Sequence, residues 1–406
     1  MSSGKSEIKV SSKDNAWTVF LVFLRLGLTS FGGPVAHLGY FRDEFVTRRR
    51  WLSEGSYADL VALCQFLPGP ASSQVGMGLG MARSGCRGAL AAWAGFTLPS
   101  ALMMSLLAMS LTTWRAAFPA GALHGLKVVG VAVVAQAVWG MARHLCTDTN
   151  RVTIAAASAC IVMLWPTALG QVVVIGVAAL AGIRLFKPSQ NLVHDPLPIP
   201  VNRRVGIMML LLFFGLLIGL PVLVEAWPNR FVALVNDFYR AGSLVFGGGH
   251  VVLPLLQAAV VPGHWVSNDT FLAGYGMAQA VPGPLLTFAA FLGASMSTPP
   301  NGWLGAAVSL ISIFVPSFLL IIGTLPFWEP LRRSAHTQAA LAGVNAAVVG
   351  LLLAALYNPV WTIAIFKPAD FGLALLALVA LVFWKLPPWL VVMGCGGSGW
   401  ALSLFL

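Results

Sequence analysis

Apolar residues along the chain gather into long continuous runs that are separated by short polar segments. Runs of about 20 apolar residues are typical of helices that cross a lipid bilayer. A first group of predicted spans covers residues 16–33, 57–80, 88–111, 122–145, 152–166 and 167–186. A polar linker at 187–204 and a single span at 205–225 follow, and a last group covers 231–247, 270–296, 302–326, 336–357, 370–385 and 388–406. The pattern predicts an all-α, polytopic integral membrane protein with about 13 transmembrane helices in a 6+1+6 arrangement.

A set of short motifs occurs twice, in the same order. The first copy consists of Arg25, Phe31, Gly32, Gly33, Pro34, Trp51, Gln65, Pro68, Gly69 and Pro70. The second copy consists of Arg240, Phe246, Gly247, Gly248, Gly249, Trp265, Gln279, Pro282, Gly283 and Pro284. The offset between copies is 214 or 215 residues throughout, and a weaker echo pairs Pro99 and Ser100 with Pro316 and Ser317. Such a register indicates an internal duplication.

The duplication predicts how the chain is organised. We expect a cytoplasmic tail at 1–15, a first repeat at 16–186, a linker with one extra span at 187–230 and a second repeat at 231–406. Seven predicted spans separate each motif from its counterpart, so the two copies should have opposite membrane orientations. Inverted repeats are typical of secondary transporters, whose substrate sites lie near the membrane midplane at the repeat interface.

The two Pro-Gly-Pro motifs predict broken helices in the middle of apolar spans. Proline cannot continue a helix, and Gly69 and Gly283 permit bends that other residues resist. A helix that restarts after the break directs free backbone N–H groups and its positive dipole end at an anion. The predicted binding groups are those of Gly69, Pro70, Ala71, Ser72, Ser73, Gly283, Pro284 and Thr287. Gln65 and Gln279 precede the breaks and either cap freed backbone groups or contact substrate.

Composition narrows the class of protein further. Charged residues make up 9% of the chain and apolar residues 58%, which excludes a soluble enzyme and a nucleic-acid binder. The predicted inside segments carry twice as many Lys and Arg residues as the outside segments, which favours a cytoplasmic N-terminus and a periplasmic C-terminus.

We expect the N-terminal apolar run to be retained. The five cysteines show no CxxC spacing and are interpreted as packing residues, so neither a metal nor a cofactor is expected.

Ionisable residues inside the predicted spans are functional-site hypotheses, because burying a charge in lipid is unfavourable. Three cations, Arg25, Lys127 and Arg240, lie in spans, against one acidic residue, Asp237. This balance favours an anionic substrate. Two alternatives stay open: Asp237 and Arg240 neutralise each other on one helix, and Lys127 extends to the membrane interface. His37 and His250 follow the glycine clusters and, with Asp237, are candidates for coupling transport to protons.

These motifs resemble those of the chromate ion transporter family, in its long form with two homologous halves. The resemblance implies export of chromate across the bacterial inner membrane, with sulfate as a related tetrahedral dianion, and no enzymatic activity. It implies that the paired motif residues, including Trp51 and Trp265, carry the function. A sulfate-type importer on the same architecture, an intramembrane enzyme and a metal-cation exporter are the alternatives. A homodimer is an open alternative to a monomer, and no nucleic-acid partner is expected.

Overall fold

A computed structural model of the chain describes residues 15–31, 33–113, 119–186, 201–246 and 249–405. The helices of the first half are α1 (Ala16–Thr29), α2 (Gly33–Arg42), the π-helical η1 (Asp43–Arg48), α3 (Glu54–Phe66), α4 (Ala71–Thr113), α5 (Ala120–Leu145), α6 (Thr149–Leu164) and α7 (Ala168–Leu185). Helix α8 (Arg203–Ala226) follows the linker. The second half begins with α9 (Arg230–Leu244), η2 (Gly249–Val251), α10 (Val252–Val260), α11 (Asn268–Ala278), η3 (Leu285–Thr287) and α12 (Phe288–Ala294). It ends with α13 (Gly302–Thr324), η4 (Leu325–Phe327), α14 (Trp328–Arg333), α15 (Ala335–Ala355), η5 (Leu356–Trp361), α16 (Thr362–Ala364), α17 (Pro368–Val382) and α18 (Pro388–Phe405).

The predicted class, an all-α membrane protein, is confirmed, whereas the count of 13 spans is not. By length and hydropathy, five helices among the described residues can cross a membrane: Ala71–Leu111, Ala120–Leu145, Arg203–Ala226, Gly302–Leu331 and Ala335–Ala364. Other apolar helices are shorter, and motif segments bound two of them, Ala16–Thr29 and Leu285–Ala294. The predicted spans 57–80 and 270–296 are each divided in two at Pro-Gly-Pro. The second part of 57–80 and the span 88–111 form the two arms of α4, which non-helical backbone at Ser84 and Gly85 separates. A Cβ atom built on Gly88 would lie 2.0 Å from the Gly80 carbonyl oxygen, so the two arms pack on each other.

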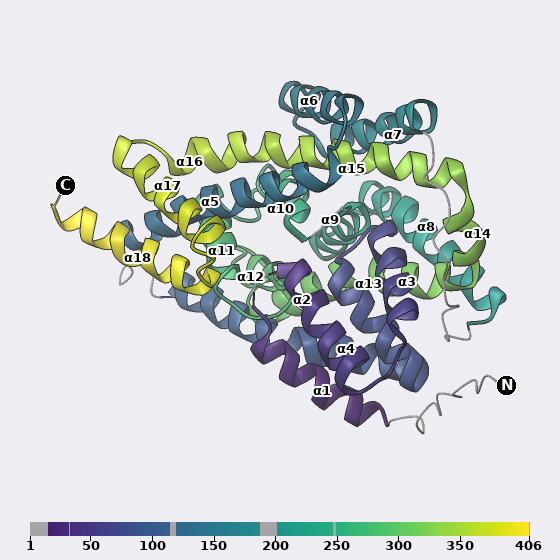
Figure 1. The fold of residues 1–406 in the computed structure, drawn as a ribbon. Coiled ribbons are helices and arrows are strands. Elements are labelled where there is room, and N and C mark those ends of the chain that lie inside the picture. The colour runs from purple at the N-terminus through teal and green to yellow at the C-terminus, as the bar shows by residue number, and fades with distance from the viewer. Residues whose placement is uncertain (1–14, 32, 114–118, 187–200, 247–248, 406) are drawn as a thin grey trace, which may run out of the picture.

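The last two helices of each half pack on the other half. Helices α6 and α7 lie against α15, and α17 and α18 lie along α5 (Figure 1). Both contacts use glycine to bring backbones close. A Cβ atom built on Gly343 of α15 would lie 2.0 Å from the Ala178 carbonyl oxygen of α7. In the equivalent contact, a Cβ on Gly125 of α5 would lie 2.1 Å from the Cys395 carbonyl oxygen of α18. The halves are therefore interlocked and related by a similar set of contacts.

The first helix of each half packs closely on a long helical segment further downstream of the break. Helix α1 lies against α4, and α9 lies against α13. Gly27 and Gly242, 215 residues apart, make these contacts: their built Cβ atoms would lie 2.8 Å from the Phe96 carbonyl oxygen and 2.1 Å from that of Ile313. Helix α8 packs on α13 and α9 and leaves most of its apolar side chains exposed, as expected of a helix that faces lipid.

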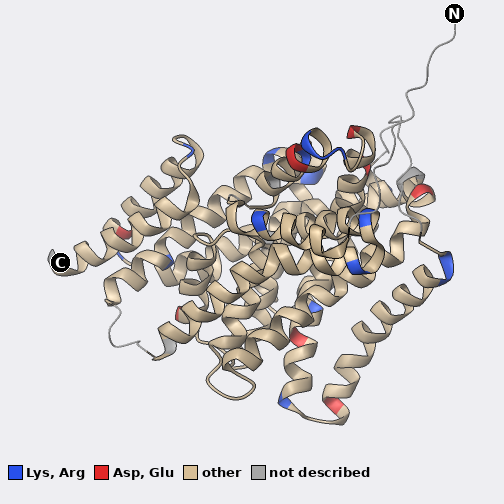
Figure 2. Cartoon of the chain, turned by 90° about the horizontal axis from the view of Figure 1, so that it is seen from below, with Lys and Arg blue, Asp and Glu red and all other residues tan. Residues whose placement is uncertain are grey.

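Charged residues are few and scattered over the ribbon (Figure 2). The segment after α2 is the most charged. There, Glu44 accepts hydrogen bonds from Arg48 (2.9 Å) and Arg49 (2.7 Å), and the Glu54 carboxylate accepts one from Arg42 (2.6 Å). Burial by itself would raise the pKa of Glu44, but the hydrogen bonds and charges of the two arginines lower it below the ordinary value of 4.5. This carboxylate is therefore ionised in the folded protein at neutral pH.

Candidate substrate cavity between the two halves

Each Pro-Gly-Pro motif ends one helix and begins another. Helix α3 ends at Phe66 and α4 begins at Ala71, whereas α11 ends at Ala278 and η3 begins at Leu285. The central glycines hold positive φ angles, +124° at Gly69 and +99° at Gly283. Residues with a Cβ rarely adopt such angles, so the glycine is required for the chain to turn at these points. The predicted broken helices are thus present in both copies.

The two breaks bond reciprocally to the opposite half. The Gly69 N–H donates to the Val245 carbonyl (2.6 Å), and the Gly283 N–H donates to the Ser30 carbonyl (2.9 Å). Ser30 and Val245 are 215 residues apart, and each precedes the Phe-Gly-Gly motif of its own half. The two breaks therefore meet at the interface of the repeats.

The serines of the Pro-Ser echo complete this symmetrical contact. A Cβ atom built on Gly69 would lie 2.7 Å from Ser317 Oγ, and one built on Gly283 would lie 2.8 Å from Ser100 Oγ. Each glycine is thus packed against the serine of the other copy. This packing explains why the Pro-Ser pair occurs in both copies of the sequence.

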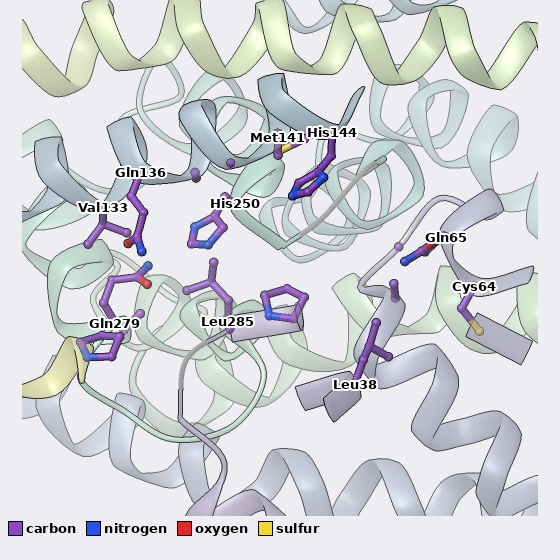
Figure 3. Close-up of a pocket in the computed structure, with 18 of the residues that line it drawn as sticks. Leu38, Cys64, Gln65, Val133, Gln136, Met141, His144, His250, Gln279 and Leu285 are labelled. Atoms are coloured by element: carbon purple, nitrogen blue, oxygen red, sulfur yellow. The ribbon is translucent and has the colours of Figure 1, made fainter. Parts of the chain in front are cut away.

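A cavity of about 670 Å³ lies where the breaks meet (Figure 3). That volume is within the range of roughly 300–1,000 Å³ found for small-molecule sites. Motif residues of both copies line the cavity: Gly33, Pro34, Gln65, Gly69, Ala71, His250, Gln279, Gly283 and Leu285. The wall is completed by side chains of α5, α15 and the start of α18, among them Gln136, His144, Asn345 and Pro388. Duplicated motifs that lie far apart in the sequence therefore form one site.

The three predicted membrane cations lie outside the lining of this cavity. Arg25 is exposed on the outer side of α1, and Arg240 of α9 is partly exposed. Lys127 lines a second cavity, of about 1110 Å³, and donates a hydrogen bond to Asp269 (2.9 Å). Neighbouring His124 makes a 2.8 Å contact with Asp370. The structure thus does not bring the cations together, and their contact with substrate stays a prediction.

Several polar residues near the breaks are buried in the protein and do not line the cavity. Ser72 and Ser73 are 2% and 3% exposed, and the Thr287 hydroxyl donates to the Pro284 carbonyl (2.8 Å). Gln74 donates to the Pro68 carbonyl (2.8 Å) and so caps the first break. Pro70, Pro282 and Pro284 shape the backbone without entering the lining. Contact between the anion and these predicted side chains is not tested.

The remaining motif residues support the repeat interface. Trp51 lies beneath the guanidinium groups of Arg83 and Arg49, and Trp265 lies beneath that of Arg230. Both indoles are almost fully buried, so the two tryptophans hold equivalent cation–π positions. Phe31 and Phe246 are partly buried beside the breaks, and Gly249 begins η2. Gly32, Gly247 and Gly248 lie outside the described residues.

The candidate coupling residues have different surroundings. His37 is buried, and its Nε2 lies 3.3 Å from the Ser30 carbonyl oxygen that also receives the Gly283 N–H. His250 lines the cavity, and its Nδ1 lies 2.8 Å from the Tyr275 hydroxyl. Asp237 accepts a hydrogen bond from the Asn236 amide (3.1 Å) and is absent from the lining.

Sequence reasoning missed Gln136, His144 and Asn345, which belong to neither motif copy. Gln136 is the one amide side chain of α5, Asn345 lies in the apolar part of α15, seven residues after Gln338, and His144 lies near the end of α5. An isolated polar side chain in an apolar span is a signal of function that could have found the two amides.

A polytopic, internally duplicated helical protein with broken helices around a central cavity has the architecture of a membrane transporter. The sequence profile of the family described as "Chromate transporter" matches residues 17–183 and 232–400. The chain belongs to this family. It is a multi-pass membrane protein and a transporter, not an enzyme.

Individual relatives agree with the family match. A chromate transport protein of Pseudomonas aeruginosa is 28% identical, over 94% of this chain and 91% of its own length. A chromate transport protein of Cupriavidus metallidurans is 27% identical, over 93% of this chain and 91% of its own length. An uncharacterised transporter of Methanocaldococcus jannaschii is 26% identical, over 86% of each chain. No solved structure matches.

Proposed function

We propose that this protein exports chromate from the cytoplasm across the bacterial inner membrane by secondary active transport. The observation that carries the proposal is the single cavity formed by the two reciprocally bonded breaks. Family membership supports the substrate, since relatives over nearly the whole length are named chromate transport proteins. Chromate would bind in the central cavity.

The breaks supply backbone groups that suit an oxyanion. Ala71 begins α4 and Leu285 begins η3, and both residues line the cavity. The first N–H groups of a helix have no partner within it and point along the positive end of its dipole. Half-helix N-termini that face an anion at the repeat interface are a known device of transporters with inverted repeats. We assign the anion to the space between these two ends, next to Gly69 and Gly283.

Alternating access follows from the interlocked halves. The two repeats contact each other through the breaks and through α5 and α15, so a rocking motion of one repeat against the other would expose the cavity to each side in turn. The asymmetry of Lys and Arg in the predicted loops supports a cytoplasmic N-terminus and a periplasmic C-terminus. Arg25→Ala tests the prediction that this cation binds substrate: it should abolish chromate resistance in protein that still reaches the membrane, and near-normal resistance at equal expression would remove Arg25 from the site.

Everted inner-membrane vesicles test substrate and direction together. Vesicles that contain the protein should take up labelled chromate faster than matched vesicles that lack it, and an uncoupler should abolish the difference if protons drive transport. Uptake that does not exceed the control overturns chromate export. Faster uptake into right-side-out vesicles, with stronger competition by sulfate than by chromate, would instead identify a sulfate-type importer.

A natural cysteine tests whether the anion occupies the central cavity. Cys64 lines the cavity and is buried, whereas Cys86 is exposed and absent from the lining. In single-cysteine variants, sulfate, used as a non-oxidising analogue, should slow alkylation of Cys64 and leave Cys86 unchanged. Equal rates with and without anion at Cys64, in protein that transports, would place the binding site elsewhere.

A further inference from the structure

The polar lining of the central cavity is uncharged in composition. Its polar side chains are the amides of Gln65, Gln136, Gln279 and Asn345 and the imidazoles of His144 and His250. No Lys, Arg, Asp or Glu occurs among the described residues that line it. An anion inside this cavity must therefore be held by hydrogen-bond donors, imidazoles and helix ends, because no Lys or Arg side chain of the described residues faces it.

Three of these groups gather at one wall. The side chains of Gln136 of α5 and Gln279 after α11 point toward each other on the same side of the cavity, and His250 of η2 lies beside them (Figure 3). The Nε2 atom of Gln279 is buried and has no hydrogen-bond partner. A buried amide donor is unfavourable unless a ligand or water satisfies it. This wall therefore has a donor available for a guest in the cavity.

The hydrogen bond of His250 determines which of its nitrogens faces the cavity as a donor. Tyr275 is fully buried, and its hydroxyl lies 2.8 Å from Nδ1 of His250. In a neutral imidazole one nitrogen donates and the other accepts, so a phenol that donates to Nδ1 leaves the proton on Nε2. Nε2 is directed toward Gly33 of the first half, 3.9 Å from a Cβ built there, and Gly33 also lines the cavity. The second half thus presents an N–H donor at the interface.

We propose that Gln136, Gln279 and the Nε2–H group of His250 bind the transported oxyanion as uncharged donors, with Tyr275 as the positioning residue for His250. The inference rests on the proposed function, because it names the groups that recognise the anion in the same cavity. It assigns recognition to side chains of both halves, α5 from the first and η2 and α11 from the second.

Uncharged donors suit a transporter for a dianion. In a site of low dielectric constant, a fixed cation attracts a dianion far more strongly than it does in water. A site that must release its guest on the other side needs binding that is favourable but weak. Neutral donors give several moderate hydrogen bonds that also replace part of the hydration shell. Selectivity then comes from the number and geometry of the donors and not from net charge.

Substitution by methionine tests the two amides, because methionine has a similar length and no donor. Gln136→Met and Gln279→Met should each raise the KM for chromate uptake into everted vesicles roughly 10–100-fold, the effect of losing one hydrogen bond to a charged group. The matched control is Gln257→Met, an amide that bonds Asn268 and does not line the cavity. Its KM should stay unchanged. An unchanged KM in both cavity variants, with normal expression, overturns the assignment.

Adding a charge gives a signature that misfolding cannot produce. Gln136→Lys should lower the KM for chromate and lower kcat as well, because a fixed cation retains the dianion. A higher KM with unchanged kcat in this variant would contradict the electrostatic part of the proposal.

Tyr275→Phe tests the positioning role. It should raise KM roughly 3–10-fold and leave kcat unchanged, because the orientation and the tautomer of His250 are no longer fixed by the phenol. In a His250→Gln background, where an amide donor replaces the imidazole, Tyr275→Phe should have no further effect on KM. An equal effect in both backgrounds would show that Tyr275 does not act through His250.

The controls separate this inference from the proposed function. If wild-type vesicles take up no chromate, the proposed function fails first. If wild-type protein transports chromate and sulfate protects Cys64, but the amide variants bind as tightly as the wild type, only the donor assignment fails.

Discussion

Replacement of Gly69 or Gly283 by alanine is the sharpest test of the interlocked breaks. Both glycines have positive φ angles and donate a backbone hydrogen bond to the opposite half. A Cβ on Gly69 would lie 2.7 Å from Ser317 Oγ and 2.6 Å from Gln74 Nε2. These separations are shorter than carbon makes with such atoms, so the neighbours or the break itself must shift.

The expected magnitude follows from two terms. A non-glycine residue held at such φ angles lowers the free energy of unfolding by about 1–3 kcal/mol, and an extra methyl group in a tightly packed site lowers it by about 1–3 kcal/mol more. A smaller gain of about 0.4–1 kcal/mol arises because alanine restricts the unfolded chain. Gly69→Ala should therefore lower the free energy of unfolding by about 2–5 kcal/mol. Adding Ser317→Ala should restore only the part of the steric term that Ser317 causes, roughly 1 kcal/mol, because the contact with Gln74 and the backbone angle are unchanged.

Thermal unfolding of the purified protein in detergent, alongside chromate uptake into everted vesicles, measures both consequences. Gly176→Ala is the matched control, since no atom lies within 4 Å of its built Cβ and its φ is not in the left-handed region. It should be neutral or slightly stabilising. If Gly69→Ala unfolds at the wild-type temperature and transports normally, the breaks do not depend on glycine as argued.

Three further outcomes are expected. Gly343→Val should prevent α7 from packing on α15, so little folded protein should be recovered from membranes. The control variant Gly215→Val, in lipid-facing α8, should accumulate normally; gel filtration in detergent measures the folded protein of both variants. Glu44→Gln should lower the free energy of unfolding by about 1–2 kcal/mol at neutral pH. Because the pKa of Glu44 is lowered in the folded protein, its stabilisation is present above about pH 4.5 and is lost as the pH falls through the folded pKa, so the melting temperatures of variant and wild type should converge in acid. The 2.9 Å ion pair between Lys127 and Asp269 joins α5 to α11, so Lys127→Asp should reduce transport and the double variant Lys127→Asp with Asp269→Lys should recover it. An equal loss of transport in the single and the double variant would refute a pairwise role.

Much of this architecture could be predicted from sequence, because its causes are local. Apolar runs specify membrane helices, and Pro-Gly-Pro specifies a break wherever it occurs. The register of the copies also predicted that Gly69 and Gly283 are equivalent. Helix bounds were partly predictable: the polar segment around Ser84 interrupts helix α4 with non-helical backbone, as hydropathy indicates, but the bounds of the shorter helices differ from the predicted spans.

The cavity lining was only half predictable. Gln65, Gly69, Ala71, Gln279 and Gly283 belong to motifs, and a duplicated motif in a transporter is expected at the interface. The long-range packing of α17 and α18 on α5, and of α6 and α7 on α15, decides that one face of α5 and one of α15 complete the wall. No local pattern shows that these two faces meet the cavity, so the polar character of Gln136 and Asn345 marks them as candidates without placing them in this site.

The position of Arg25 shows why counting charges in apolar runs overstates their burial. The sequence pattern merges α1 with the Phe31 segment into one span, which places Arg25 near mid-membrane. Helix α1 has only 14 residues, about 21 Å of rise, against a hydrocarbon core of about 30 Å. Arg25 lies one turn before Thr29, the last residue of α1, and is exposed. A long arginine side chain there can reach polar surroundings, so the insertion penalty that made it a binding candidate is largely avoided. The other two cations differ from Arg25, because Arg240 is partly exposed and Lys127 is mostly buried beside Asp269. Contact of the three cations with substrate stays a prediction, whereas a scan for amides in the apolar parts of helices finds side chains that do line the cavity.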